Sequence, residues 1–285
     1  MNAGPLVLVL IAALAHALWN LASKDADGDT FVFVWAYTAL SGVLCLVVTV
    51  TVPMSRGETR TWSLALAAFV SAALHVVYSL VLQRGYRSSD VGLVYPVARG
   101  TGPLLTLIVA IALLGERPGV VATLGALLII AGVVVVIGNP FVGGTPLGPL
   151  LWGVATGASI SAYTLWDSYS IATLHLQPVT YFAATLILET LLLSPWAVQR
   201  RSAIPKTVGA NLRAIGLVAI LSPLAYILVL TALQTLPVAI VAPLRESSIV
   251  IAALLAWWLF HERHVARRIA GAAVVLGGIA LISLR

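Results

Sequence analysis

Apolar runs of roughly 18 to 24 residues follow one another along the 285-residue chain, each long enough to cross a ~30 Å hydrocarbon core as a helix. Short breaks with Gly, Pro and charged residues separate the runs. The pattern predicts ten membrane-spanning helices, at residues 5–22, 31–53, 62–82, 91–114, 118–138, 147–170, 178–198, 214–233, 238–260 and 267–284. The longest expected loop, about 199–213, leaves no room for a separate soluble domain. We therefore expect an all-α polytopic membrane protein.

Composition supports this class of protein. The chain is 60% hydrophobic and 9% charged, whereas soluble domains carry about 25% charged residues. The net charge of +6 does not indicate nucleic-acid binding, because the basic residues lie mainly in short loops, where they orient helices and meet lipid headgroups. The first apolar run has no basic segment before it and ends in Trp19-Asn20, so we expect a retained helix and not a signal peptide. The single cysteine, Cys45, excludes an internal disulfide.

An internal repeat relates the two halves of the chain. A shift of 146 or 147 residues places Arg99 on Arg245 and Leu18-Trp19-Asn20 on Leu165-Trp166-Asp167. The same shift places Glu116-Arg117 on Glu262-Arg263, Gly125 on Gly271 and Gly132 on Gly278. Each half, 1–140 and 141–285, holds five expected spans, and an odd number inverts the second half in the membrane. The sequence thus predicts two five-helix inverted repeats in one compact membrane domain, an arrangement typical of secondary transporters.

Both halves end in a similar motif. In the first half it is Leu113-Leu114-Gly115-Glu116-Arg117 followed by Gly125-Ala126 and Ala131-Gly132-Val133, and in the second it is His261-Glu262-Arg263 with Gly271 and Gly277-Gly278. These motifs resemble the EamA-type transporters of the drug/metabolite transporter superfamily. The resemblance implies ten helices, a central cavity lined by helices one to four and six to nine, and movement of small metabolites by alternating access. Residues 15–20 and 95–103 resemble a subgroup with some members linked to phosphonate metabolism.

Two arguments about orientation disagree. We expect the chain to lie in the inner membrane of the cell. The resemblance implies that both of its termini face the cytoplasm. However, most of the loop lysines and arginines lie in the odd-numbered loops, which by the positive-inside rule places the termini outside. Orientation stays open at this point, as do the substrate, the direction of transport, the coupling ion and the oligomeric state.

Two arginines lie deep inside apolar spans, at Arg99 and Arg245. Such a residue costs about 2.5 kcal/mol on insertion scales. Helix breakers accompany both, with Pro96, Gly100, Gly102 and Pro103 around Arg99 and Pro243 before Arg245. Because a guanidinium fork suits carboxylate, phosphonate or phosphate, we expect both arginines to bind an acidic group of the substrate. The alternative is a structural ion pair with Glu189 or Glu246. Arg245 and Glu246 are not expected to pair with each other, since neighbours on a regular helix point about 100° apart.

Acidic residues and histidines inside the spans are candidates for proton coupling. They are Asp167, Glu189, Glu246, His16 and His75. Glu189 is preferred as the proton carrier, with neutralisation of a buried arginine as its alternative role. Asp167 corresponds to Asn20 in the repeat. The alternative role of these two residues, and of the two histidines, is a hydrogen bond to a neighbouring helix.

Aromatic residues inside the spans are expected to wall the substrate pocket. With Asn20, the substrate-binding candidates are Trp19, Tyr78, Tyr95, Tyr163, Trp166 and Tyr226. Tryptophans at span ends are instead expected to be interfacial anchors. Glu116 and Glu262 are expected to cap a helix or to form an ion pair within their hairpins. The glycines spaced by seven, at 125 and 132 and at 271 and 278, are expected to be packing surfaces.

These observations predict a secondary active transporter of a small polar metabolite that is anionic or zwitterionic, amino-acid-like or phosphonate-like. Its expected partners are this substrate, the lipid bilayer and protons as a candidate coupling ion. No metal-ligand spacing, P-loop or Gly-x-Ser-x-Gly elbow occurs in the sequence, so no metal, cofactor or enzymatic activity is expected. One alternative is an exporter of hydrophobic or cationic drugs, with structural arginines. An intramembrane lipid-modifying enzyme is disfavoured, because no motif positions a nucleophile.

Overall fold

The computed structural model describes residues 4–23, 26–51, 62–88, 91–137, 147–260 and 265–283, and every secondary-structure element in these ranges is a helix. The first half holds α1 (Gly4–Ala22), α2 (Thr30–Thr51), α3 (Trp62–Ser88), α4 (Val91–Ala112) and α5 (Val120–Ile137). The second half holds α6 (Leu147–Ala172), α7 (Pro178–Gln199), the 3-10 turn η1 (Arg201–Ala203), α8 (Ile204–Ala210), α9 (Leu212–Leu233), α10 (Val238–Arg245), α11 (Ser247–Phe260) and α12 (Val265–Ser283).

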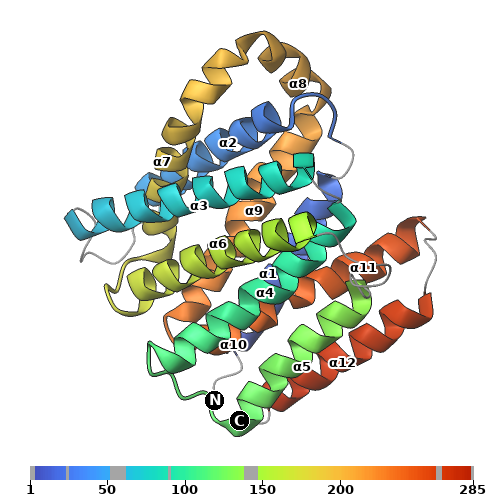
Figure 1. Cartoon of the computed structure of the whole chain (residues 1–285). Helices are drawn as coiled ribbons and strands as arrows, with labels where there is room; N and C mark the ends of the chain where they lie inside the picture. The colour runs from blue at the N-terminus through green and yellow to red at the C-terminus, as the bar shows by residue number, and fades with distance from the viewer. Residues whose placement is uncertain are drawn as a thin grey trace.

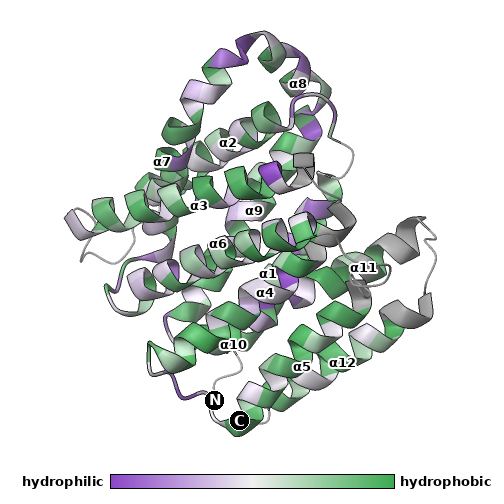
Figure 2. Cartoon of the chain, viewed as in Figure 1, coloured by the Kyte–Doolittle hydropathy of each residue, from purple (hydrophilic) through white to green (hydrophobic). Residues whose placement is uncertain are grey.

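A helix lies at each predicted span, and two differences are informative. The ninth span is divided into α10 and α11, and the short helix α8 lies in the long loop before α9. Five helices, α1, α2, α3, α7 and α9, are long and apolar enough to cross a bilayer, and shorter apolar helices lie within α4, α5 and α12. Figure 2 shows hydrophobic residues along most of the helices. The protein is thus a multi-pass helical membrane protein, and the count of ten crossings stays a prediction.

Helices from before residue 140 pack mainly on helices from after residue 146. The most extensive helix pairs are α5 with α12, α4 with α6, α1 with α9 and α2 with α7, and α3 contacts both α6 and α7. Figure 1 shows the green α5 beside the red α12, and the blue-green α4 beside the yellow-green α6. The core is therefore built between the two sequence halves. Their relation as inverted repeats stays a prediction.

Glycines bring the backbones of α5 and α12 into close contact. A Cβ atom added to Gly278 would lie 2.6 Å from the carbonyl oxygen of Gly125, and one added to Gly132 would lie 2.7 Å from Val275. The expected role of these glycines as packing surfaces is confirmed. In the same way, Gly157 of α6 leaves room for the Thr101 side chain of α4, which fixes the helix that carries Arg99.

Glu116 joins the two halves at the turn between α4 and α5. Its carboxylate accepts hydrogen bonds from the backbone N–H groups of Val238, at 3.0 Å, and Ala239, at 2.9 Å. These N–H groups belong to the first turn of α10, where no intrahelical acceptor is available and the helix dipole favours a negative charge. The expectation of helix capping is confirmed, but the capped helix is α10 and not one of its own hairpin. Its repeat mate Glu262 lies outside the described residues.

The glycine contact predicts a position-specific loss of stability. We expect Gly278→Ala to destabilise the protein by roughly 1–3 kcal/mol, the usual cost of overpacking, because its new methyl group meets backbone atoms of α5. The midpoint of thermal unfolding in detergent measures this effect. Gly277→Ala is the matched control on the same helix, since its methyl group would meet only Leu128 at 3.5 Å. Equal midpoints for the two variants would contradict the packing argument.

Candidate functional site

The ninth predicted span is interrupted at Glu246. Pro243 lies inside α10, which ends at Arg245, and α11 begins at Ser247. Glu246 itself forms a turn, with its backbone N–H bonded to the carbonyl oxygen of Pro243 at 3.0 Å. The helix breaker before Arg245 thus coincides with a real interruption. The corresponding helix, α4, continues through Pro96, Gly100, Gly102 and Pro103, so the two halves differ at this place.

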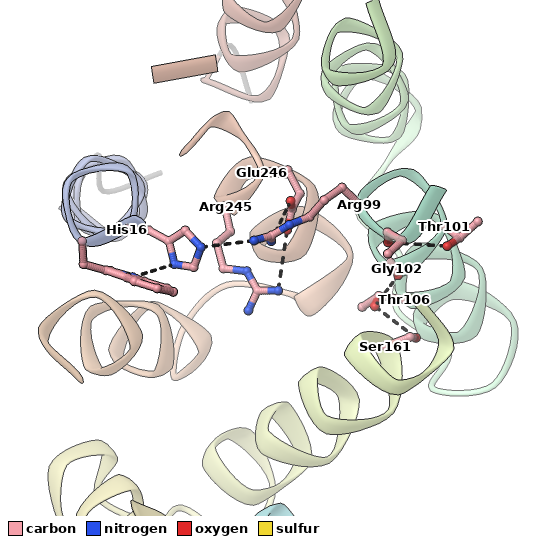
Figure 3. Close-up of polar contacts among 10 residues, drawn as sticks. His16, Arg99, Thr101, Gly102, Thr106, Ser161, Arg245 and Glu246 are labelled. Atoms are coloured by element: carbon pink, nitrogen blue, oxygen red, sulfur yellow. Dashed lines mark hydrogen bonds and ion pairs between the residues drawn. The ribbon is translucent and has the colours of Figure 1, made fainter. Parts of the chain in front are cut away.

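Glu246 is the carboxylate that two buried arginines share. Nη1 of Arg99 lies 3.3 Å from Oε2 of Glu246, and Nη2 of Arg245 lies 3.7 Å from Oε1 (Figure 3). The side chains are 12%, 8% and 1% exposed for Arg99, Arg245 and Glu246. The expectation that Arg245 and Glu246 would not pair is wrong, because the chain leaves the regular helix between them. Arg99 and Arg245, remote in sequence, are thus brought to one carboxylate.

His16 of α1 completes this cluster. Its Nε2 atom lies 3.4 Å from Nη2 of Arg99, and its Nδ1 atom accepts a hydrogen bond from the indole N–H of Trp19 at 3.3 Å. The two rings meet edge to face, with centroids 4.9 Å apart. Figure 3 shows His16 of α1, Arg99 of α4, and Arg245 and Glu246 at the end of α10 approaching one another. We call these four residues with Trp19 the arginine cluster.

The arginine cluster carries an excess of positive charge among the described residues. Two guanidinium groups face one carboxylate, and guanidinium stays protonated in proteins. In addition, Oε1 of Glu246 and the hydroxyl of the adjacent Ser247 are buried without a hydrogen-bond partner in the described part of the chain. Buried polar atoms of this kind usually have a partner. The arrangement therefore suits a further polar group, and its charge suits an anion.

A second cluster surrounds Asp167 of α6. Its Oδ1 atom accepts hydrogen bonds from Ser71 at 2.7 Å and from Tyr181 at 2.6 Å, and its Oδ2 atom accepts one from Tyr226. These donors come from α3, α7 and α9. Asp167 thus connects four helices, which agrees with its expected alternative role as an inter-helix hydrogen bonder.

Aromatic rings connect Asp167 to the arginine cluster. His75 stacks on Tyr163 with centroids 4.2 Å apart, and Tyr78 and Tyr226 meet Tyr163 edge to face. Arg245 lies within electrostatic range of Tyr163 and Tyr226. We call Asp167 with His75, Tyr78, Tyr163 and Tyr226 the tyrosine cluster. It adjoins the arginine cluster through Arg245.

Glu189 of α7 lies beside the tyrosine cluster. It is 8% exposed and interacts electrostatically with His75, Asp167 and Tyr37. Its expected alternative role, neutralisation of a buried arginine, belongs instead to Glu246 for both Arg99 and Arg245. Its role as a proton carrier stays a prediction.

The remaining candidates have other contacts. Trp166 donates its indole N–H to the backbone carbonyl of Ala67 at 2.9 Å, so it is tied to α3, unlike its repeat mate Trp19. Asn20 donates to the backbone carbonyl of His16 at 2.7 Å. The side chain of Tyr95 lies outside the described part of the structure. The sequence analysis did not identify Tyr181, which is fully buried against Asp167. This tyrosine lies within an apolar span, and a shift of 147 residues places it on the apolar Val34, so the repeat does not mark it.

A cavity of about 330 Å³ opens where α1 and α2 are joined. Its lining residues are Trp19, Ser23, Ala26, Asp27, Thr30, Phe33, Val34 and Tyr37. Trp19 therefore contacts both this cavity and His16. Among the described residues, no group of three or more His, Cys, Asp or Glu side chains is arranged to hold a metal ion.

Comparison with known proteins gives one family match and several relatives. An uncharacterized protein of Pseudomonas aeruginosa is 31% identical over 288 residues, covering 97% of this chain and 93% of that protein. The probable 4-amino-4-deoxy-L-arabinose-phosphoundecaprenol flippase subunit ArnE of Salmonella enteritidis is 35% identical over 88 residues, 30% of this chain and 79% of that subunit. A crystal structure is similar with a TM-score of 0.81 at 17% identity, covering 100% of this chain and 98% of that chain, which shows the fold.

The family match covers nearly the whole sequence. The model of the EamA-like transporter family matches residues 4–138 and again residues 147–284. Members of this family are transporters, and no catalytic family is indicated. From the two matches and the helical membrane fold, we conclude that this chain belongs to the EamA-like transporter family.

Proposed function

We propose that the protein is a secondary active transporter of a small polar metabolite that is anionic or zwitterionic, and that the arginine cluster binds its acidic group. The observation that carries this proposal is the pair of buried guanidinium groups sharing the single carboxylate of Glu246. A bound carboxylate, phosphonate or phosphate would balance the remaining positive charge and accept hydrogen bonds in the fork geometry of arginine.

The tyrosine cluster favours a substrate with a second, cationic end. Asp167 and Glu189 supply acidic groups near the rings of this cluster: Tyr226 donates to Asp167, and His75 lies within electrostatic range of Glu189. A zwitterion such as an amino acid or an aminophosphonate presents opposite charges to these two regions. The name of the ArnE relatives describes a compound that has an amino group and a phosphate link, which agrees with recognition of both charges.

We further propose that two inverted repeats, 1–140 and 141–285, alternate access to this site in the inner membrane. The packing of α5 with α12 and of α2 with α7 pairs corresponding helices of the two halves, as a two-fold relation requires. The cavity opens at the α1–α2 end of the site. In a ten-helix arrangement the turn after α4 would lie on the opposite side of the membrane, and there the Glu116 carboxylate holds the first half on α10. The described conformation would thus be accessible from the α1–α2 end only.

An exporter of hydrophobic or cationic compounds is the second candidate function. The stacked rings of His75 and Tyr163 beside the two acidic residues favour it, since aromatic faces attract cations. Under this alternative, the arginines serve only to hold α1, α4 and α10 together. The two candidates differ in which charged ligands bind and in what the arginine variants lose.

The arginine variants test the anion site. We expect Arg99→Gln and Arg245→Gln to lower uptake of 2-aminoethylphosphonate or glutamate into proteoliposomes by roughly ten- to a hundredfold, because a hydrogen bond to a charged group contributes about 1.5–3 kcal/mol. Arg99→Lys keeps the charge opposite Glu246 and hence the fold, but loses the fork, and we expect a smaller loss. Arg213→Gln, which removes an exposed guanidinium, is the control.

Three results of this experiment contradict the proposal. One is transport by both glutamine variants at the wild-type rate, and another is binding of tetraphenylphosphonium but of neither anionic probe. The third is a lack of flux of any of these probes through the wild-type protein. The unfolding midpoint of each variant shows whether a loss of flux reflects the site or the fold.

Glu189 tests proton coupling. We expect Glu189→Gln to abolish accumulation driven by a pH gradient and to retain exchange of labelled for unlabelled substrate, because a neutral amide can bind but cannot release a proton. Both assays use the same proteoliposomes, with the pH gradient imposed in each direction. Accumulation by Glu189→Gln under the gradient, at the wild-type level, would show that the coupling group lies elsewhere.

A further inference from the structure

The imidazole of His16 lies between two groups that can only donate hydrogen bonds. The indole of Trp19 faces Nδ1 at 3.3 Å, and the guanidinium of Arg99 faces Nε2 at 3.4 Å. Indole and guanidinium have N–H donors and no acceptor, whereas a neutral imidazole has one acceptor nitrogen and one N–H. One of the two contacts therefore brings N–H groups face to face. An imidazolium would make both contacts unfavourable and would add a third cation to the cluster.

Each tautomer of His16 satisfies one of these two contacts. Trp19 lies one turn after His16 on α1, and its ring meets the imidazole edge-on with an interplanar angle of 75°. In contrast, Arg99 reaches His16 from α4 with a long side chain that also contacts Glu246. In the tautomer that accepts from Trp19 at Nδ1, the proton lies on Nε2, directed at Arg99.

We propose that His16 is an anion-binding residue of the transporter, with its Nε2–H and the Nη2 group of Arg99 converging on one oxygen of the ligand. This inference rests on the proposed function and assigns the residue a role different from proton relay. In this tautomer the Nε2–H of His16 and the Nη2–H of Arg99 face each other, and neither can accept a hydrogen bond from the other. The ligand oxygen would accept from both. It can be a carboxylate, phosphonate or phosphate oxygen, because the chemistry of the two donors is shared by all three.

The geometry requires a small movement of Arg99. Two donors at about 2.9 Å from one oxygen have nitrogens more than 3.4 Å apart unless the angle between the bonds is unusually narrow. The flexible arginine side chain, not the ring held by Trp19, is the group that would shift. Because His16 stays neutral, it adds a hydrogen bond without adding charge. Its binding therefore leaves the charge of the two guanidinium groups and the Glu246 carboxylate unchanged.

Trp19 is a positioning residue in this arrangement. It fixes the tautomer of His16 and also lines the cavity at the α1–α2 end. A ligand entering from that cavity passes the indole before it reaches the two donors. Replacement by phenylalanine keeps a ring in place and removes the N–H that selects the tautomer.

The test compares four new variants, together with Arg99→Gln and Arg245→Gln, as full chains in detergent by calorimetric titration with methylphosphonate and with acetate. We expect His16→Phe to weaken binding roughly ten- to a hundredfold, and His16→Gln to retain it within a few-fold, because the glutamine amide restores a neutral donor. Trp19→Phe should weaken binding several-fold, since both tautomers become populated. His175→Asn is the control, a replacement in an exposed loop at a φ of 53° that asparagine tolerates.

The outcomes separate this inference from the proposed function. If His16→Phe binds both anions like the wild type while Arg99→Gln does not, His16 is not a ligand and the anion site stands. If His16→Gln loses binding as fully as His16→Phe, and both unfold at a lower temperature without ligand, its role is structural and the inference is overturned. If the arginine variants bind like the wild type, or the wild type binds neither anion, the proposed function itself fails.

Discussion

The shared carboxylate of Glu246 is the constraint on which the centre of the molecule depends. It brings Arg99 of α4 and Arg245 of α10 to one place, at 3.3 and 3.7 Å, with His16 of α1 beside them. A carboxylate at this depth is costly without partners, and so is each guanidinium. Removal of either arginine from this place would leave the buried carboxylate with one ion-pair partner fewer. The positions of α1, α4 and the α10–α11 break are therefore coupled. Binding of the proposed substrate at this point would therefore act on the arrangement of both halves.

Much of the fold follows from the sequence because span length is a property of the bilayer. The apolar runs predict the ends of α1, α2, α6, α7 and α9 within a few residues, and the repeat marks Arg99 and Arg245 as corresponding residues. Contacts that depend on one turn were not predictable in this way. The pairing of Arg245 with Glu246 needs the chain to leave the helix at a single residue, and the cap of Glu116 on α10 needs the turn after α4 to reach the other half. The sequence marks these residues as unusual but does not specify their partners.

Repeat mates in this structure have different surroundings, and alternating access gives a reason. Trp19 contacts His16 whereas Trp166 contacts the backbone of α3, and α4 is continuous whereas α10 and α11 are separate helices. In the proposed mechanism, each half adopts in one state the conformation that its mate adopts in the opposite state. Corresponding residues must then differ in any state that is open to one side only. Near-identical environments for all the repeat mates would instead indicate a symmetric, occluded arrangement.

The arginine cluster is also a poor solution if stability were its only role. Replacement of a buried ion triad by apolar residues of similar volume is often neutral or stabilising by about 1–4 kcal/mol, and lipid-facing apolar residues are plentiful in this chain. A structural cluster would in addition be expected to match its donors with acceptors. Here the two neighbours of His16 are both donors, and Oε1 of Glu246 and the Ser247 hydroxyl have no hydrogen-bond partner among the described residues. A ligand with several acceptor oxygens and a hydroxyl or ammonium donor would remove this mismatch, so the proposed binding of such a ligand accounts for the cost of the cluster.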